Sequence, residues 1–197
     1  EYDTMYHEHL RYYGLKQLIN LFDIYGMEVF DVELMPAQGG SIRVYTSFKG
    51  KFTISDSVKK VLHNEEEKNL HSLDTWKTFA SSVAENKEKL CSILSEIKSQ
   101  NKNIVGISAP GRSTTVLNFC NINSDTLDYI TEKSNLKIGK YTPGTHILVE
   151  DDEKLVTEQP DYGLLLSWHL ADSIIPKIRK NGYKGKIIVN LPEPKIL

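Results

Sequence analysis

The segment Tyr6-His7-Glu8-His9 places two imidazoles and a carboxylate beside a phenol, and a second phenol follows at Tyr12. Imidazole is the side chain that exchanges protons near neutral pH, and phenols and carboxylates can orient it or share its proton. If the segment is helical, Tyr6, His9 and Tyr12 share one face. The spacing therefore predicts a proton-transfer site. The alternative is a helix N-terminus that uses these residues as hydrogen-bonded, half-buried packing groups.

A metal ion is a weaker interpretation of the same segment. His7 and His9 are two positions apart, whereas the zinc-binding His-Glu-x-x-His helix separates its histidines by four, and no third ligand is obvious. We therefore expect no metal site in this chain.

Composition excludes several classes of protein. The 197 residues carry a formal net charge of -2 with both signs interspersed, which argues against a nucleic-acid surface or a basic membrane patch. No apolar run approaches the roughly 20 residues of a membrane span. Cys91 and Cys120 are too few for a disulfide framework, which fits a reducing cytoplasm. We expect a cytoplasmic protein whose partner is a small molecule, and the start at Glu1 rather than Met suggests a piece of something longer.

The first half of the chain reads as a helix, a strand pair and a long helix. Apolar residues at helical spacing predict a helix over residues 14–26, and alternation predicts antiparallel strands within 27–48, joined by a turn at 36–40. Residues 50–57, polar and glycine-containing, indicate a boundary between two units. Residues 70–98 then follow the three- and four-residue steps of one long helix, which most simply is a core element or a strut.

The second half predicts a parallel sheet covered by helices. Short apolar strands are expected at 103–109, 127–131, 145–149, 162–167 and 187–190, with a helix at 173–180. Ligands of such sheets bind at the carboxyl ends of the strands, where Ser108, Trp168, His169 and Asn190 would lie. The turn that contains His146 could join them, although each of these groups could also be structural.

The turn at 110–115 is a candidate anion site. Arg112 supplies a cation and Ser113 and Thr114 supply hydroxyls where a helix is expected to begin and continue through Asn118. Phosphate is the natural ligand, although the turn lacks the lysine and spacing of a nucleotide-triphosphatase loop. The alternative is a tight turn between strand and helix, capped by serine.

Together these motifs resemble the S-adenosylmethionine-dependent C-methyltransferases that act on nucleotide-linked deoxysugars in bacteria. The residues that carry the resemblance are 6–10 with Tyr12, 26–32, 39–43, 106–118, 141–147 and 161–168. The resemblance covers the C-terminal half of such a protein. It implies that a zinc-binding N-terminal module and the glycine-rich loop that holds the cofactor are absent from this chain.

The resemblance also implies roles for single residues. The family moves a methyl group to carbon 3 of a 4-keto sugar, which must first lose a proton. By resemblance His9 is the base, and Tyr6 and Glu8 place it or handle the enolate, which is the chemistry that imidazole suits. The nucleotide-diphosphate sugar is then expected to be bound by residues that share the carboxyl edge of the sheet or the strand pair: Tyr12, Arg43, Ser108, Arg112, Ser113, Thr114, Asn118, His146, Trp168 and His169.

The expected fold is α/β: a Rossmann-like parallel sheet with flanking helices, preceded by the helix and antiparallel strand pair that end a class I methyltransferase domain. The expected parts are residues 1–50 as that tail, 51–101 as a helical connector and 102–197 as the sugar-nucleotide domain. Two other functions stay open. One is a non-catalytic nucleotide or nucleotide-sugar binding module, in which the Tyr6–His9 cluster would have no path to solvent. The other is a scaffold that assembles through the long helix.

Overall fold

The computed structural model describes residues 1–36 and 40–197. The chain forms two compact units: residues 1–8 with 82–197, here called the parallel-sheet unit, and residues 9–81, here called the hairpin unit. The predicted turn at 36–40 falls largely outside the described residues. None of the helices in the described part is long and apolar enough to cross a membrane.

The hairpin unit packs two helices on an antiparallel strand pair. Its elements are α1 (Leu15–Ile24), β1 (Met27–Met35), β2 (Ser41–Phe48) and α2 (Asp56–Glu67). The strand register runs from Met27 opposite Phe48 to Met35 opposite Ser41, with a bulge between Val29 and Asp31. The antiparallel pair predicted from the alternation is thus confirmed. Its core consists of Leu15, Val29, Val32 and Val58.

The stretch at 50–57 leads from β2 into α2 without leaving the hairpin unit. The hydroxyls of Ser55 and Ser57 donate to the carboxylate of Asp31 on β1, at 2.7 and 2.5 Å. These hydrogen bonds lower the pKa of Asp31 and connect the segment to the strand. The division between the two compact units falls between Ser81 and Ser82, and the predicted parts 1–50, 51–101 and 102–197 stay a prediction.

That division lies inside the long helix α3 (Leu73–Ser99), which the sequence predicted at 70–98. The helix begins at Leu73 because the turn before it is held by side chains: Trp76 donates its indole N–H to the carbonyl of Leu70 at 2.8 Å, and Ser72 accepts the N–H of Asp74. Only the second half of α3 is buried, where Leu90 is fully covered, whereas Leu73 is 68% exposed.

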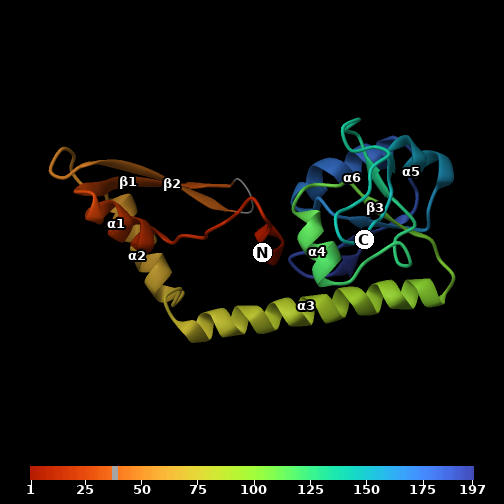
Figure 1. Ribbon diagram of the computed structural model, residues 1–197, viewed down its shortest axis with the longest axis horizontal. Coiled ribbons are helices and arrows are strands. Elements are labelled where there is room, and N and C mark those ends of the chain that lie inside the picture. Colours follow the sequence, from red (N-terminus) through yellow and green to blue (C-terminus); the bar gives the residue numbers. More distant parts are fainter. Residues whose placement is uncertain (37–39) are drawn as a thin grey trace. The chain divides into compact units, whose positions relative to one another are not determined.

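The parallel-sheet unit has six strands in the order β5-β4-β3-β6-β7-β8. All neighbouring pairs are parallel except β7 with β8. Figure 1 labels β3 within this unit. The strands are β3 (Ile104–Ile107), β4 (Ile130–Glu132), β5 (Val149–Asp151), β6 (Tyr162–Leu165), β7 (Lys186–Val189) and β8 (Lys195–Ile196). The predicted mostly parallel sheet is confirmed, although β4 and β5 begin three and four residues later than their sequence patterns did.

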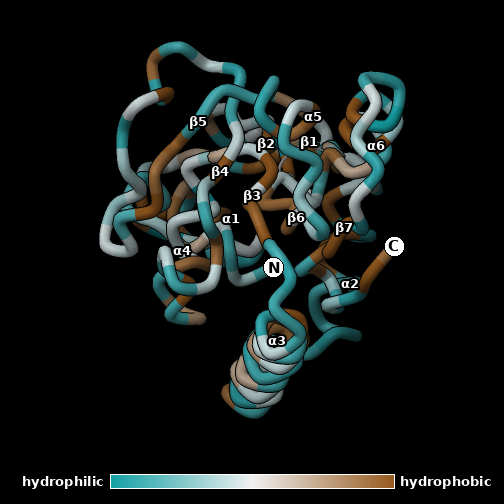
Figure 2. Tube along the Cα trace, turned by 90° about the vertical axis from the view of Figure 1, so that its right-hand side faces the viewer, coloured by the Kyte–Doolittle hydropathy of each residue, from teal (hydrophilic) through white to brown (hydrophobic). Residues whose placement is uncertain are grey.

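Helices and a hydrophobic interior hold this sheet together. The helices are α4 (Ser113–Phe119), α5 (Glu153–Glu158) and α6 (Ala171–Lys180), with single 3-10 turns at Tyr2–Thr4 and Trp168–Leu170. Figure 2 shows the mostly hydrophobic colours of β3 and β7, whose residues pack into the core. Gly106 is required within β3, because a Cβ there would lie 2.7 Å from Cγ1 of Ile130 on β4.

The strand order defines a switch point in the sheet. From β3 the chain proceeds to β4 and β5 on one side, then returns to place β6 on the other side of β3. In open α/β sheets a crevice forms where the order reverses, at the carboxyl ends of the strands, and ligands bind there. The residues that follow β3 and β6 are therefore the first to consider as a site.

Candidate functional site

Ser108 and Ser167 meet at the switch point. Each follows one of the two central strands, and the hydroxyl of Ser108 donates to that of Ser167 at 2.6 Å. Ser108 has a φ of 63°, a left-handed conformation that residues other than glycine seldom adopt and that is concentrated at functional sites. The sequence predicted Ser108 at this edge, and its position there agrees with the prediction.

Glu132, at the end of β4, holds the loop after β3. Its carboxylate accepts the backbone N–H of Ala109 at 3.0 Å, and Lys137 donates its ammonium both to that carboxylate and to the carbonyl of Ala109. Burial acts to raise the pKa of Glu132, but the backbone N–H groups of Ala109, Lys133 and Ser134 and the charge of Lys137 outweigh it, so the pKa is lowered. The ionised carboxylate of Glu132 therefore fixes the loop after β3 by hydrogen bonds.

Arg112 already has an anion beside it. Its guanidinium donates Nε–H and NH2 to the two carboxylate oxygens of Asp3, at 2.7 and 2.8 Å, and Trp168 donates its indole N–H to the same carboxylate at 2.7 Å. Asp3 and Arg112 are 1% and 4% exposed. The predicted anion position next to Arg112 is thus taken by a carboxylate of the chain itself. Diphosphate binding by Arg112 stays a prediction, and a ligand would have to share or displace Asp3.

The hydroxyl of Ser113, in the same turn, is also hydrogen-bonded. Ser113 is buried and donates to the carbonyl of Pro110 at 2.6 Å, which closes the turn but does not cap the helix. Asn118 donates its amide to the carbonyls of Thr114 and Pro143, at 2.8 and 3.1 Å. Asn118 therefore ties α4 to the turn that carries His146, whose own φ of 52° is left-handed.

His169 lies at the surface next to Trp168. Partial removal of its ring from water, followed by the positive charge of Arg112, lowers the pKa of His169. The neutral imidazole is therefore favoured near neutral pH, with one nitrogen able to donate and the other able to accept a hydrogen bond.

The segment that carries Tyr6 and His9 is not helical, so the helical alignment of Tyr6 with His9 is wrong. Its one 3-10 turn ends at Thr4, because Met5 and Tyr6 leave the helical conformation. Tyr6 packs against the loop after β3, and a Cβ on Gly111 would lie 3.7 Å from Cε2 of its ring. His7 and Glu8 are exposed, with Nε2 and Oε1 3.9 Å apart.

The remaining predicted residues belong to the hairpin unit. The rings of His9 and Tyr12 lie edge to face with centroids 6.4 Å apart, and His9 is half-buried. Arg43 donates to Glu33 across the strand pair at 3.2 Å, and both side chains are about half exposed. Tyr12, unlike Arg43, lines a pocket.

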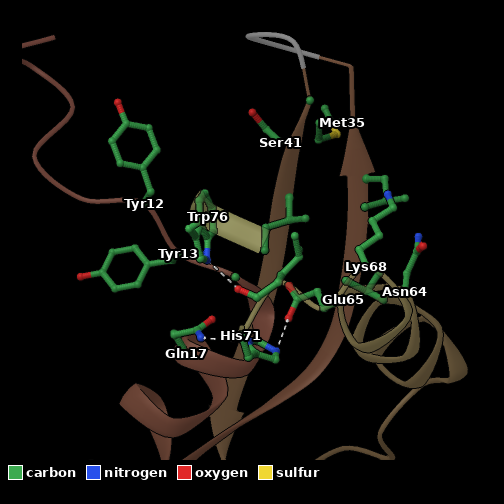
Figure 3. A pocket seen from close by; sticks show the side chains of 16 residues that line it. Tyr12, Tyr13, Gln17, Met35, Ser41, Asn64, Glu65, Lys68, His71 and Trp76 are labelled. Atoms are coloured by element: carbon green, nitrogen blue, oxygen red, sulfur yellow. Dashed lines mark hydrogen bonds and ion pairs between the residues drawn. The ribbon is translucent and has the colours of Figure 1, made fainter. Parts of the chain in front are cut away.

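This pocket, of about 680 Å³, lies between the start of α1, the end of β1, the start of β2, α2 and the turn before α3 (Figure 3). Its wall is aromatic, with Tyr12, Tyr13 and Trp76. Glu65 lies at one side, where its carboxylate accepts the N–H groups of Leu15 and Lys16 and comes within 3.8 Å of the imidazole of His71. Glu65 therefore holds the start of α1 in place at the side of the pocket.

The fold and site define a known domain. The chain belongs to the family described as the C-methyltransferase C-terminal domain, which matches residues 36–192. It is also 28% identical over 201 residues to the C-methyltransferase NovU of Streptomyces niveus, an alignment that spans 100% of this chain and 47% of that protein. The chain thus spans about half the length of the curated relative that it matches. Tyr6, Glu8 and His9 precede the range matched by the family and fall within the alignment to NovU.

Within its described residues, the hairpin unit does not contain the strand-turn-helix arrangement that commonly binds S-adenosylmethionine. Residues 9–36 and 40–81 form two helices and an antiparallel pair, not the parallel strand and helix whose connecting turn receives such adenosyl groups. The turn of that kind in the other unit, between β3 and α4, carries Arg112, whose guanidinium is paired with Asp3. Within 1–36 and 40–197, moreover, no three His, Cys, Asp or Glu side chains are grouped as a metal would require.

Asp3, Glu132 and Ser167 were not singled out from the sequence. The partners of Asp3 are far away in the chain, as is Ala109, which donates to Glu132, so no local spacing marks these two carboxylates. Asn190 was expected at a strand end and lies there, fully buried. Within the described residues neither atom of its side-chain amide has a hydrogen-bond partner, which makes Asn190 a further polar group at this edge.

Proposed function

We propose that this chain is the C-terminal part of an enzyme that methylates carbon 3 of a nucleotide-linked 4-keto-deoxysugar, and that it supplies the base and the sugar-nucleotide site. Membership in the C-methyltransferase domain family supports methyl transfer. The structural observation that carries the proposal is the packing of Tyr6 on the Gly111 loop, because it puts one of the proposed catalytic residues beside the carboxyl edge of a sheet, where ligands bind.

The chemistry requires a base and a partner for developing negative charge. A proton next to a ketone is only modestly acidic, so a base that titrates near neutral pH is needed together with a donor for the enolate oxygen. We assign the base to His9, and we assign its placement or the stabilisation of the enolate to Tyr6 and Glu8. The exposed or half-buried state of His7, Glu8 and His9 supports access by a substrate.

The sugar nucleotide would be bound by groups that donate hydrogen bonds or stack at the edge of the sheet. Ser108, Thr114 and His169 have polar atoms there, and Trp168 offers an indole face for a base or a sugar. The other proposed contacts are Arg112, Ser113, Asn118 and His146, with Tyr12 and Arg43 from the hairpin unit. On this proposal residues 1–50 are the tail of the methyltransferase domain, and the methyl donor, S-adenosylmethionine, binds to the part of the cytoplasmic enzyme outside this chain.

Isotope exchange tests the proposal without methyl transfer. We would incubate the full-length protein with 4-keto-deoxysugars linked to thymidine, uridine, guanosine or cytidine diphosphate in deuterated water and follow carbon 3 by NMR. One substrate should exchange its proton and, once S-adenosylmethionine is added, gain a methyl group. His9→Ala should slow exchange by roughly 10²- to 10⁴-fold, as expected for a lost general base.

His7→Ala is the matched control, since it removes an imidazole two residues away and should leave exchange within a few-fold of the wild type. Exchange that survives His9→Ala at the full rate would exclude His9 as the base. Tight binding of one sugar nucleotide with neither exchange nor methylation would favour the non-catalytic binding module instead.

A further inference from the structure

The N-terminal segment, residues 1–8, is packed along α4 of the parallel-sheet unit (Figure 1). The ring of Tyr2 lies 5.5 Å from that of Phe119, and its hydroxyl donates to Oδ1 of Asn86 on α3 at 3.3 Å. Thr115 donates its hydroxyl to the carbonyl of Met5 at 3.0 Å. The segment is thus held at several points before it reaches Tyr6.

The central contact is the buried cluster of Asp3, Arg112 and Trp168. It connects three parts of the chain: the N-terminal segment, the loop after β3 and the turn after β6. The two parallel N–H···O bonds between Arg112 and Asp3 fix direction as well as distance, which a single contact from a lysine would not do. The loop after β3 and the turn after β6 flank the switch point.

A buried ion pair of this kind contributes little net free energy to folding. A buried ion pair is often no more stabilising than apolar side chains of the same size, whereas the loss of one partner leaves an uncompensated charge. Its best-attested use is to select one arrangement of the elements that it joins. Here the element selected is the one that carries Tyr6 and Glu8, three and five residues after Asp3.

We propose that Asp3 and Arg112 are positioning residues for the reaction: their ion pair, completed by Trp168, holds the N-terminal segment so that Tyr6 and Glu8 are presented at the switch point. This inference rests on the proposed function and deepens it. It gives Arg112 a role that differs from diphosphate binding. A ligand role would appear in substrate affinity, whereas a positioning role appears in the rate of the chemical step.

The test is Asp3→Asn in the full-length enzyme, because asparagine keeps the shape and removes the charge. We expect kcat to fall about 10- to 100-fold, as for a catalytic group displaced by about 1 Å, with little change in the dissociation constant of the nucleotide diphosphate. Amide hydrogen exchange of residues 2–8 should become faster. If Arg112 mainly bound the diphosphate, release of its guanidinium from Asp3 would instead tighten nucleotide binding, and that result would overturn the proposal.

Asp161→Asn is the matched control. Asp161 also accepts a lysine ammonium, at 2.9 Å, and a backbone N–H, at 3.1 Å, but it precedes β6 at the opposite edge of the sheet and its side chain is 38% exposed. This variant should keep kcat and the exchange of residues 2–8 unchanged. An equal loss of kcat in both variants would show a general effect of charge and contradict the proposal.

One further variant and the hydrogen-exchange measurement cover the other outcomes. If Asp3→Asn does not fold, Trp168→Phe takes its place, because it removes one hydrogen bond to Asp3 and retains an aromatic ring. It should lower kcat and speed the amide hydrogen exchange of residues 2–8 to a smaller degree. No change in either kcat or this exchange would overturn the proposal. If the wild-type enzyme methylates no sugar, the proposed function fails, while faster hydrogen exchange in residues 2–8 of Asp3→Asn would still establish that the pair holds the segment.

Discussion

The carboxylate of Glu65, on α2, accepts the backbone N–H of Leu15 in the first turn of α1, 50 residues earlier in the chain. Gly14 precedes that turn and has no side chain that could satisfy these N–H groups. A carboxylate from another helix therefore caps α1, and its negative charge is also favoured at a helix N-terminus. Glu65 is 7% exposed, which keeps the contact away from water.

We expect Glu65→Gln to destabilise the hairpin unit by about 1–2 kcal/mol, because the amide keeps one acceptor but loses the charge. Urea unfolding followed by circular dichroism measures the change. Glu66→Gln, an exposed neighbour on the same helix, should change stability by less than about 0.5 kcal/mol. Equal effects of the two substitutions would mean that the Glu65 contact does not hold α1.

Glu132→Gln should make stability less dependent on pH. The folded-state pKa of Glu132 lies below its unfolded value, so the carboxylate contributes stability above the unfolded pKa of about 4.3 and loses it as the pH falls through the folded pKa. Wild type and variant should therefore differ most at pH 7, by about 1–3 kcal/mol, and the difference should shrink as the pH falls below the unfolded pKa and through the folded pKa. Urea titrations at a series of pH values would show this, and a constant difference down to pH 3 would contradict it.

The two halves of α3 should respond differently to the same substitution. Leu90 is fully buried, so Leu90→Ala should cost about 2–5 kcal/mol, whereas Leu73→Ala, at a position 68% exposed, should cost far less. Thermal unfolding of both variants measures the difference. A large effect at Leu73 in the full-length protein would show that another part of the protein covers this end of the helix.

Local pattern predicted the elements of this fold well. Alternation at residues 27–48 gave the strand pair, and apolar runs gave β3, β6 and β7, because these strands are short and set by their own residues. The condition that the segment around Tyr6 be helical is not met, because the conformation there is set by distant groups: Asp3 pairs with Arg112, and Thr115 holds Met5. Spacing along the chain carries no signal of such contacts.

For the same reason, only the positions of some candidate residues, and not their contacts, could be predicted from the sequence. Residues such as Ser108 and Trp168 follow predicted strands, and the rule that ligands bind at strand ends brings them together. Their partners could not be found in this way. The partner of Ser108 is Ser167, 59 residues later, and the partner of Trp168 is Asp3, 165 residues earlier. The charge on Arg112 could be read from the sequence, but its neutralisation by Asp3 could not.

Gly144 tests how the turn near His146 is held. Its φ is +81°, and a Cβ there would lie 2.1 Å from Oδ1 of Asn118, so Gly144→Ala combines backbone strain with displacement of the Asn118 amide. Gly139 is the matched control, since its φ is +78° and a Cβ there meets no atom within 4 Å. Gly139→Ala should cost about 1–2 kcal/mol from strain alone, and Gly144→Ala should cost clearly more. Urea unfolding of both variants isolates the contribution of the Asn118 contact as their difference. Equal stability of the two variants would show that the amide of Asn118 moves aside at no cost.

The same two variants test whether Asn118 also positions the sugar nucleotide. If it does, Gly144→Ala should weaken nucleotide binding in calorimetric titrations and Gly139→Ala should not.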